Sequence, residues 1–200
     1  PVAVLADLFD VSTLRIAIHA AAPCPVETMQ RMMEWWRTMI FEYYSSTEGM
    51  GSTMITSEEW LAHPGSVGQA FYTRIHILDE EGNEAPTGTP GVVWFEPGER
   101  TMSFEYHKDP GKTAGTRDER GWASVGDIGY VDAEGYLYLT DRRDFMIVSG
   151  GVNIYPQEAE NLLVTHDKVM DAAVFGIPDP EMGEKVHAVV QPIDMGTAGP

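Results

Sequence analysis

A hydroxyl and a carboxylate are adjacent at Thr47 and Glu48, followed by Gly49 and preceded, three residues earlier, by Tyr44. A threonine hydroxyl can donate a hydrogen bond to a phosphate oxygen, whereas a carboxylate approaches a phosphate only when a divalent cation lies between them. The ring of Tyr44 offers a flat face on which a base can stack. Together these residues predict a magnesium-nucleotide site, although Thr-Glu-Gly by itself is also a common surface turn.

Asp127, in the stretch GDIGY, and Arg142 form a second candidate group. A carboxylate at a strand start can accept hydrogen bonds from both vicinal hydroxyls of a ribose, and each charge-assisted bond contributes about 1.5–3 kcal/mol. Arg142 could hydrogen-bond a ribose or phosphate oxygen. The alternatives are structural: an aspartate that caps a turn, and a surface ion pair of Arg142 with Asp141 or Asp144, which contributes little stability.

Gly150 and Gly151 lie between an apolar strand and the turn IYP. Glycine permits positive φ and a close approach of the backbone to a ligand, although a plain turn would need the same residues. Other familiar patterns are missing from the sequence, which has no G-x-S-x-G elbow, no P-loop and no dinucleotide fingerprint. The six histidines show no metal-ligand pairing, so a zinc site is not expected.

The charge balance of the chain excludes several classes of partner. Thirteen Lys and Arg against 31 Asp and Glu give a net charge of −18, which repels phosphate backbones and anionic lipid, so we expect no nucleic-acid or membrane-surface binding. No apolar run approaches the roughly 18–20 residues of a membrane span. The single cysteine, Cys24, cannot form an internal disulfide, which favours a reducing, cytoplasmic compartment.

An α/β arrangement of elements positions the first candidate group. Residues 14–19 predict a strand that runs into a tight loop at 20–23, and residues 26–39 predict a helix with apolar positions at three- and four-residue steps. A second strand over 40–44 leads into the polar loop 45–51. Ligands bind beyond the carboxyl ends of such strands, so we expect both loops to open on one edge.

From residue 65 the pattern changes to short strands with alternating apolar residues and acidic turns. The strands at 72–78 and 91–95 predict a hairpin-rich barrel or a small sheet. Further strands are predicted at 169–177 and 186–190. A helix is predicted between the glycine pair and the first of these strands, and together they indicate an α+β unit.

The predicted fold class is therefore α/β plus a β-barrel-like region, followed by a partial α+β domain at the C-terminus. The expected large domain covers residues 1–143, with an α/β segment at 1–60 and a β-rich segment at 65–143. The expected small domain covers residues 144–200, with a helix that opens at Pro156, a residue favoured in the first helical turn.

The order and spacing of four segments resemble the characteristic segments of the adenylate-forming superfamily, and among its members most resemble fatty-acid and aryl-acid CoA ligases. The segments are AAAPCP, YYSSTEG, GWASVGDIGYVD and DRRDFMIVSGGVNIYPQEAE. The resemblance covers nearly the whole chain from Leu14 to Val190, and the last two segments are the more specific. That family activates a carboxylate with ATP to an acyl-adenylate, releases pyrophosphate, and transfers the acyl group to CoA. The resemblance therefore implies an AMP-forming acid–thiol ligase that uses ATP, Mg²⁺ and CoA.

The resemblance also implies functions for the residues of the first group. Thr47 would contact the phosphate and Glu48 would hold magnesium, which makes them the catalytic pair. The residues that would surround the adenine are Tyr44, which would stack on it, and the bordering backbone of Ala21, Ala22 and Pro23.

The resemblance also implies functions for the second group and for the residues that follow it in the sequence. Asp127 and Arg142 would bind the ribose hydroxyls. Asp144 falls at the family's hinge, about which the small domain rotates between adenylation and thioester formation. Gly150 and Gly151 would then line the pantetheine tunnel in the second state.

Several features depart from the family pattern. Ser45 stands where glycine is usual in Tyr-Gly-x-Thr-Glu, which should narrow the acyl side of the pocket or shift the loop, and Phe145 replaces a common acid after the hinge. The Ser/Thr/Gly-rich phosphate-binding loop expected upstream is missing, and so is the catalytic lysine expected beyond residue 200. Because the chain also starts at Pro1 without a methionine, we expect a fragment of a longer enzyme that makes no acyl-adenylate by itself.

Other readings stay open. One is an adenylation module that hands its acyl group to a carrier-protein thiol, or a member that oxidises its adenylate. Another is a non-catalytic AMP-sensing protein, although a scaffold would have no need for Glu48 and Asp127. The apolar Met50, Met54 and Ile55 lean toward a fatty or aryl acid. The oligomeric state is open, a homodimer included.

Overall fold

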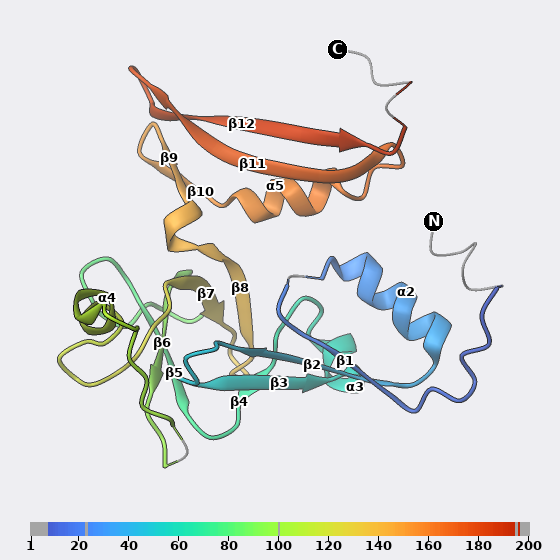
Figure 1. The fold of residues 1–200 in the computed structure, drawn as a ribbon, viewed down its shortest axis with the longest axis horizontal. Helices are drawn as coiled ribbons and strands as arrows, with labels where there is room; N and C mark the ends of the chain where they lie inside the picture. Colours follow the sequence, from blue (N-terminus) through green and yellow to red (C-terminus); the bar gives the residue numbers. More distant parts are fainter. Residues whose placement is uncertain (1–7, 23, 100, 195, 197–200) are drawn as a thin grey trace. The chain divides into compact units, whose positions relative to one another are not determined.

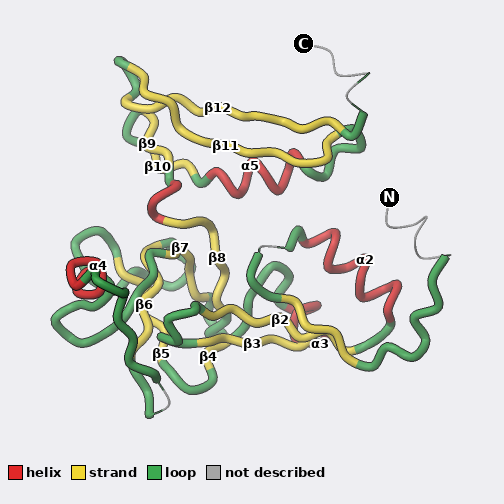
Figure 2. The backbone as a smooth tube through the Cα atoms, in the orientation of Figure 1, coloured by secondary structure: helices red, strands yellow, loops and turns green. Residues whose placement is uncertain are grey.

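The computed structural model describes residues 8–22, 24–99, 101–194 and 196. The chain divides into two compact units. The first unit comprises residues up to Val125 together with Gly129–Leu139, and the second comprises Gly126–Ile128 together with Thr140 onward. Figure 1 labels the elements of each unit, and Figure 2 separates helices, strands and loops by colour. Every helix in the described residues is too short or too polar to cross a bilayer.

The first unit contains a four-stranded sheet in the order β1-β2-β3-β4. β1 (Ile16–His19) and β2 (Met39–Ser45) are parallel, and α2 (Val26–Trp36) connects them. β3 (Ser52–Thr56) and β4 (Gln69–Ala70) extend the sheet with antiparallel pairing. The predicted order of strand, loop, helix and strand is confirmed, and the loops that follow β1 and β2 lie at the same sheet edge because the two strands are parallel.

Helix α2 is shorter than the sequence predicts, because it ends at Trp36 rather than at Met39. Arg37 adopts a left-handed backbone with φ 50° and donates its N–H to the carbonyl of Met33, which is a C-cap geometry that stops a helix. Met39 then begins β2. The apolar stripe of the helix fills a core, as predicted, and the buried members of that core are Met29, Ile40, Ile55 and Trp60.

β3 and α3 (Ser57–Ala62) have no counterpart among the predicted elements. A capping box starts α3: the hydroxyl of Thr56 accepts the N–H of Glu59 at 3.3 Å, and the Glu59 carboxylate accepts the N–H of Thr56 at 2.9 Å. The spacing Thr-x-x-Glu ahead of Trp60 is the sequence signal that identifies this helix start.

The β-rich segment forms a second four-stranded sheet in the order β5-β6-β7-β8. Its strands are β5 (Arg74–Leu78), β6 (Gly91–Glu96), β7 (Asp127–Val131) and β8 (Leu137–Arg142). In the described part of the chain this sheet is open, with β5 and β8 as its outer strands, so the barrel-like expectation is wrong and the small-sheet alternative holds. An interior wide enough for packed side chains generally takes about eight strands. The buried core residues on this sheet are Met50, Ile77, Val93, Phe95, Ala123 and Leu137.

In its described residues, the second unit contains an α-helix and a sheet in the order β10-β9-β12-β11. β9 (Ile147–Ser149) and β10 (Val152–Ile154) form a short hairpin, and β11 (Val169–Asp179) and β12 (Gly183–Pro192) form a long one. Helix α5 (Pro156–Leu163) begins at the predicted proline. The predicted α+β character of this region is confirmed.

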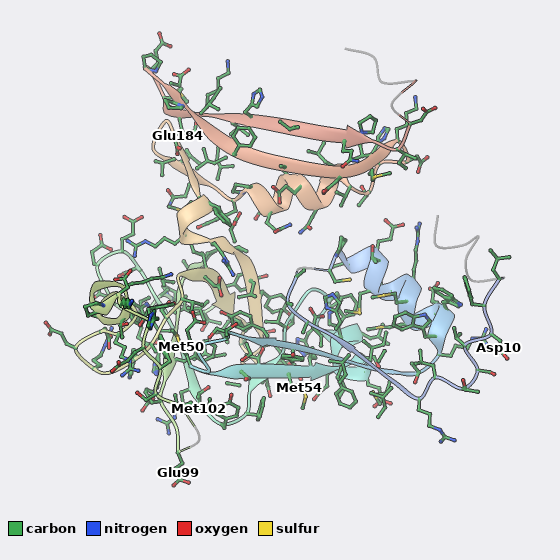
Figure 3. All side chains as sticks on the ribbon, viewed as in Figure 1. Asp10, Met50, Met54, Glu99, Met102 and Glu184 are labelled. Carbon is green, nitrogen blue, oxygen red and sulfur yellow. The ribbon has the colours of Figure 1, made fainter. Side chains whose placement is uncertain are left out.

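Two carboxylates fasten the elements of the second unit through backbone donors. Glu160, on α5, accepts the N–H of Val174 at 2.8 Å, and Glu184, labelled in Figure 3, accepts the N–H of Val148 at 2.7 Å. Hydrogen bonds to a charged acceptor are stronger than neutral ones, so these contacts hold the helix and the short hairpin against the long hairpin.

Candidate functional site

The loop that follows β1 lies beside the end of β2. His19, the last residue of β1, stands opposite Glu42 in the parallel register, and Ala21 and Ala22 follow in an exposed bend. Ala21 has φ 74°, a left-handed conformation that is uncommon for a residue with a Cβ and that concentrates at ligand-binding sites. Pro23 lies outside the described residues.

Tyr44 and Ser45 end β2 at the same edge. The ring of Tyr44 is half-buried, packs on the second-sheet core, and has its centroid 6.1 Å from that of Phe95. The hydroxyl of Ser45 donates to the carbonyl of Gly51 at 3.1 Å and accepts from the hydroxyl of Ser52 at 3.1 Å. A glycine at position 45 could make neither bond, so this departure from the family pattern ties together the two ends of the loop.

Thr47 and Glu48 occupy the centre of a turn. The N–H of Gly49 donates to the carbonyl of Ser46 at 3.0 Å, and Gly49 has φ 67°. The surface-turn alternative is therefore correct as a description of the backbone, and it places the exposed Thr47 and the partly exposed Glu48 where a ligand can reach them. Met102, labelled in Figure 3, lies beside the turn, since a Cβ on Gly49 would be 3.7 Å from its Cβ.

The carboxylate of Glu48 has a partner that the sequence did not indicate. The hydroxyl of Tyr106 donates to Glu48 Oε1 at 2.6 Å, across 58 residues of chain. This hydrogen bond is the main reason that the pKa of Glu48 is lowered, with a smaller contribution from the charge of Lys112. The same bond raises the pKa of Tyr106 to about 12. No local pattern links residues at this separation, so only the fold brings them together.

The side chains at this turn fit a hard divalent cation. Magnesium takes oxygen ligands and is commonly held by one or two carboxylates together with substrate phosphates and water. Glu48 has a second carboxylate oxygen beyond the one bound by Tyr106, and the buried hydroxyl of Ser46 lies close enough to the carboxylate to help lower its pKa. Nowhere in the described residues do three His, Cys, Asp or Glu side chains gather as a complete metal site. A cation here would therefore take its other ligands from a nucleotide and from water.

Asp127 and Arg142 come together in the second unit. β7 begins at Asp127 and β8 ends at Arg142, and Nε of Arg142 lies 3.3 Å from Oδ1 of Asp127. The Asp127 side chain is 11% exposed and that of Arg142 is 67% exposed. The ion pair expected as an alternative, with Asp141, is not the one observed, because the Asp141 carboxylate accepts two backbone N–H groups, from Arg142 at 2.7 Å and from Gln157 at 3.0 Å.

The remaining predicted residues follow in the same unit. Asp144 lies in the 3₁₀ helix Arg143–Phe145, between β8 and β9, and its side chain is outside the described part of the structure. Gly150 and Gly151 form the two-residue turn of the β9–β10 hairpin with φ 58° and 79°, the positive pair that a type I′ turn requires. The N–H of Gly150 donates to the carbonyl of Met182 at 2.8 Å.

A buried acidic side chain under the first loop was also missed. Glu42 is 8% exposed, and burial raises its pKa to about 7. Burial also lowers the pKa of His19 and raises that of Cys24 to about 11. Nδ1 of His19 is 3.4 Å from Glu42 Oε1 without hydrogen-bond geometry, and the side chain of Trp60 interacts with Glu42 and partly offsets the effect of burial on its pKa. The strand pattern of β2 gives no sign of this cluster, since a glutamate is an uncommon inward residue.

The apolar residues expected to indicate the acid lie in separate places. Met50, labelled in Figure 3, is 2% exposed in the core of the second sheet, and Ile55 is 1% exposed in the core under α2. Met54 is 46% exposed. Two of the three are core residues, so they carry no information about a fatty or aryl tail.

Comparisons with known proteins identify the family of this chain. The family model for AMP-binding enzymes matches residues 3–103, and the model for the AMP-binding enzyme C-terminal domain matches residues 158–198. A (7a-methyl-1,5-dioxo-octahydro-1H-inden-4-yl)propanoyl:CoA ligase from Rhodococcus jostii is 38% identical over 183 residues, which cover 91% of this chain and 34% of the relative. A feruloyl-CoA synthase from an Amycolatopsis species is 34% identical over 188 residues, which cover 92% of this chain and 37% of the relative.

Solved structures with the same fold include an o-succinylbenzoate CoA synthetase from Bacillus subtilis. In complex with its acyl-adenylate intermediate, that enzyme superposes with a TM-score of 0.83 at 29% identity, over 97% of this chain and 40% of that one. Its complex with ATP and a magnesium ion gives a TM-score of 0.81 at 29% identity, over 94% of this chain and 39% of that one.

Proposed function

We propose, since this chain belongs to the family of AMP-binding enzymes, that the natural protein activates a carboxylic acid with ATP to an acyl-adenylate and then transfers the acyl group to the thiol of CoA. The chain spans 34% and 37% of the length of the two curated relatives described above, so the activity is assigned to the whole protein. Both relatives are named for attaching an acid to CoA.

The observation that carries this proposal is the placement of Glu48. Its carboxylate is held on an open turn, at the carboxyl end of β2, by a hydrogen bond that keeps it ionised. A magnesium ion bound there would neutralise the phosphate charge that develops when a carboxylate attacks ATP. Thr47, exposed beside it, would donate its hydroxyl to the same phosphate.

Each unit has groups of its own that are suited to a nucleoside. In the first unit, the half-buried ring of Tyr44 would stack on the adenine, and the bend at Ala21 and Ala22 would border it. In the second unit, the Asp127 carboxylate would accept from the ribose hydroxyls and Arg142 would donate to a ribose oxygen. The ion pair between them supports this assignment because it places a donor beside the carboxylate, with Nε of Arg142 3.3 Å from Oδ1 of Asp127.

The two proposed half-reactions, adenylation and thioester formation, need different protein groups beside the carbonyl carbon of the substrate acid, and a hinge between domains can exchange those groups. We assign the boundary between the large and small domains to residues 143 and 144, with Asp144 as the hinge. Its backbone lies in a short 3₁₀ segment between strands, which is the kind of element that absorbs a change of φ and ψ. Gly150 and Gly151 would line the path of the CoA thiol, because a turn without Cβ atoms lets a ligand approach closely.

The acid is proposed to carry an apolar aryl or alkyl body. Support comes from the relatives, whose names specify feruloyl and methyl-octahydroindenyl acyl groups, rather than from residues of this chain. We expect the reaction in the reducing cytoplasm, consistent with a free Cys24 whose pKa is raised by burial.

The experiment is an ATP–pyrophosphate exchange assay of the natural protein with a panel of fatty and aryl acids, followed by thioester formation with CoA or a carrier-protein thiol. We expect acid- and magnesium-dependent exchange, acyl transfer to CoA, and loss of exchange in Glu48→Gln. Glu119→Gln, which changes an exposed carboxylate elsewhere in the first unit, is the matched control. Absence of exchange with every acid, or full exchange in Glu48→Gln, would refute the proposal.

A further inference from the structure

Tyr106 connects Glu48 to a short helix far along the chain. The backbone N–H of Tyr106 donates to the hydroxyl of Thr113 at 2.9 Å, and Thr113 lies in α4 (Pro110–Gly115). The same hydroxyl donates to the carbonyl of Asp109 at 3.0 Å, at the start of that helix. The backbone of Tyr106 is therefore fixed by the first turn of α4 instead of by a strand.

The ring of Tyr106 is held from two further sides. The ammonium group of Lys112 lies 4.2 Å from the ring centroid, and the ring of Phe104 meets it edge-on with centroids 5.7 Å apart. A cation over an aromatic face and an edge-to-face ring pair are both attractive arrangements. Because these contacts define the ring plane, they also define the direction in which the hydroxyl of Tyr106 points, which is toward Glu48.

The backbone N–H of Glu48 and the hydroxyl of Ser46 also interact with the Glu48 carboxylate, but the hydrogen bond from Tyr106 lowers its pKa the most. Glu48 lies in a turn with Thr47 and Gly49, so an unrestrained side chain would sample several rotamers, and ordering it on a metal would cost conformational entropy. A carboxylate has about four acceptor positions on two oxygens, so a hydroxyl and a cation can share it. Outer-shell partners of this kind orient metal-ligating carboxylates in many sites.

We propose that Tyr106 is a positioning residue that fixes the Glu48 carboxylate so that its second oxygen meets a divalent cation carried by the nucleotide. This inference rests on the proposed function, because it takes Glu48 as the ligand of that cation. Lys112 supports it from outside, by holding the ring of Tyr106.

The test compares two tyrosines whose hydroxyls each donate to a carboxylate in the first unit. Tyr106→Phe removes the bond to Glu48, and the control Tyr138→Phe removes a bond of 3.3 Å to Asp132. Phenylalanine retains the ring in both variants, so the contact with Lys112 is kept. Thermal unfolding of each variant checks that the fold is intact. The natural protein is used throughout.

The first measurement is the affinity for Mn²⁺ in the presence of ATP. Electron paramagnetic resonance detects the bound Mn²⁺, and the measurement requires no turnover. We expect Tyr106→Phe to weaken Mn²⁺ binding about tenfold, the lower end of the effect reported for outer-shell partners. Tyr138→Phe should leave it unchanged. In the exchange assay, the half-saturating Mg²⁺ concentration should rise by the same factor in Tyr106→Phe while KM for the carboxylic acid stays constant.

The second measurement places Tyr106→Phe in a Glu48→Gln background. Both changes should then weaken Mn²⁺ binding no more than Glu48→Gln alone, because Tyr106 acts only through Glu48. Equal Mn²⁺ affinity in wild type and Tyr106→Phe would overturn the inference, and so would an additive loss in the double variant. If the wild-type protein shows no acid-dependent exchange, the proposed function fails. If wild-type exchange is normal and Tyr106→Phe binds Mn²⁺ with wild-type affinity, only the positioning inference fails.

Discussion

Arg142 and Asp127 form an ion pair in which Nε and Oδ1 are 3.3 Å apart, joining the last residue of β8 to the first residue of β7. The acid is nearly buried and the arginine is mostly exposed, so the pair contributes little to stability. The ion pair instead affects the position of the Asp127 carboxylate relative to its neighbouring donor. The carboxylate of Asp127 lies at a strand start beside a donor that reaches solvent, which is an arrangement compatible with the proposed binding of a diol.

Asp127→Asn is expected to weaken nucleotide binding about tenfold, because the amide keeps the shape of the side chain but loses the charge that strengthens hydrogen bonds to ribose hydroxyls. Titration of the natural protein with AMP by calorimetry measures the change. Glu119→Gln, on an exposed loop, should bind AMP like wild type. An unchanged AMP affinity in Asp127→Asn would remove this residue from the nucleotide site.

Glu42→Gln is expected to stabilise the protein at alkaline pH and much less at acid pH. The pKa of Glu42 is raised from 4.5 in the unfolded chain to about 7 by burial, so the folded state binds the proton more tightly. The free energy of unfolding therefore falls by on the order of 1–3 kcal/mol as pH rises from about 4.5 to about 7. Above that pH it is constant with respect to this group. Glutamine removes this loss.

Urea unfolding of both proteins at pH 5 and pH 8 provides the measurement. The difference in unfolding free energy between Glu42→Gln and wild type should be larger at pH 8 than at pH 5. A difference that is the same at both pH values would show that the carboxyl group of Glu42 is not buried in a way that changes its titration.

Gly51→Ala is expected to destabilise the first unit by about 1–3 kcal/mol, because a Cβ at this position would lie 2.2 Å from Cδ1 of Phe95, a core residue. The backbone at Gly51 is not in the left-handed region, so the cost arises from the side-chain contact. Phe95→Leu should reduce the cost of Gly51→Ala by about 1 kcal/mol in a double-mutant cycle measured by urea unfolding. Strict additivity of the two substitutions would contradict this contact.

Asp141→Ala is expected to destabilise the start of α5 by about 1 kcal/mol, because its carboxylate accepts the N–H of Gln157 at 3.0 Å and so caps the helix. Asp141→Asn should lose less, since the amide oxygen can still accept. Hydrogen exchange measures the effect locally: the amide of Gln157 should exchange faster in Asp141→Ala, while amides in β1 and β2 keep their rates. Unchanged exchange at Gln157 would show that this hydrogen bond is not formed in solution.

Local features of this protein are readable from its sequence. Thr47, Glu48 and Gly49 adjoin one another, Pro156 marks a helix start, and Gly150-Gly151 marks a tight turn, because each depends on backbone preferences within a few residues. Parallel pairing of β1 and β2 also follows from the helical period between two strands. The same local rules failed at Met39, where a left-handed Arg37 ended the helix early.

Tertiary structure alone decided what surrounds the candidate residues. The partner of Glu48 is 58 residues away at Tyr106, the partner of Arg142 is Asp127 rather than the neighbouring Asp141, and Glu42 is buried on a strand whose pattern does not reveal it. Contacts between distant segments depend on how sheets and loops pack, and burial sets the dielectric environment that shifts a pKa. Neither long-range contacts nor burial can be deduced from the spacing of residues along the chain. The sequence therefore indicated which residue types could act, and only the tertiary structure determined their partners and surroundings.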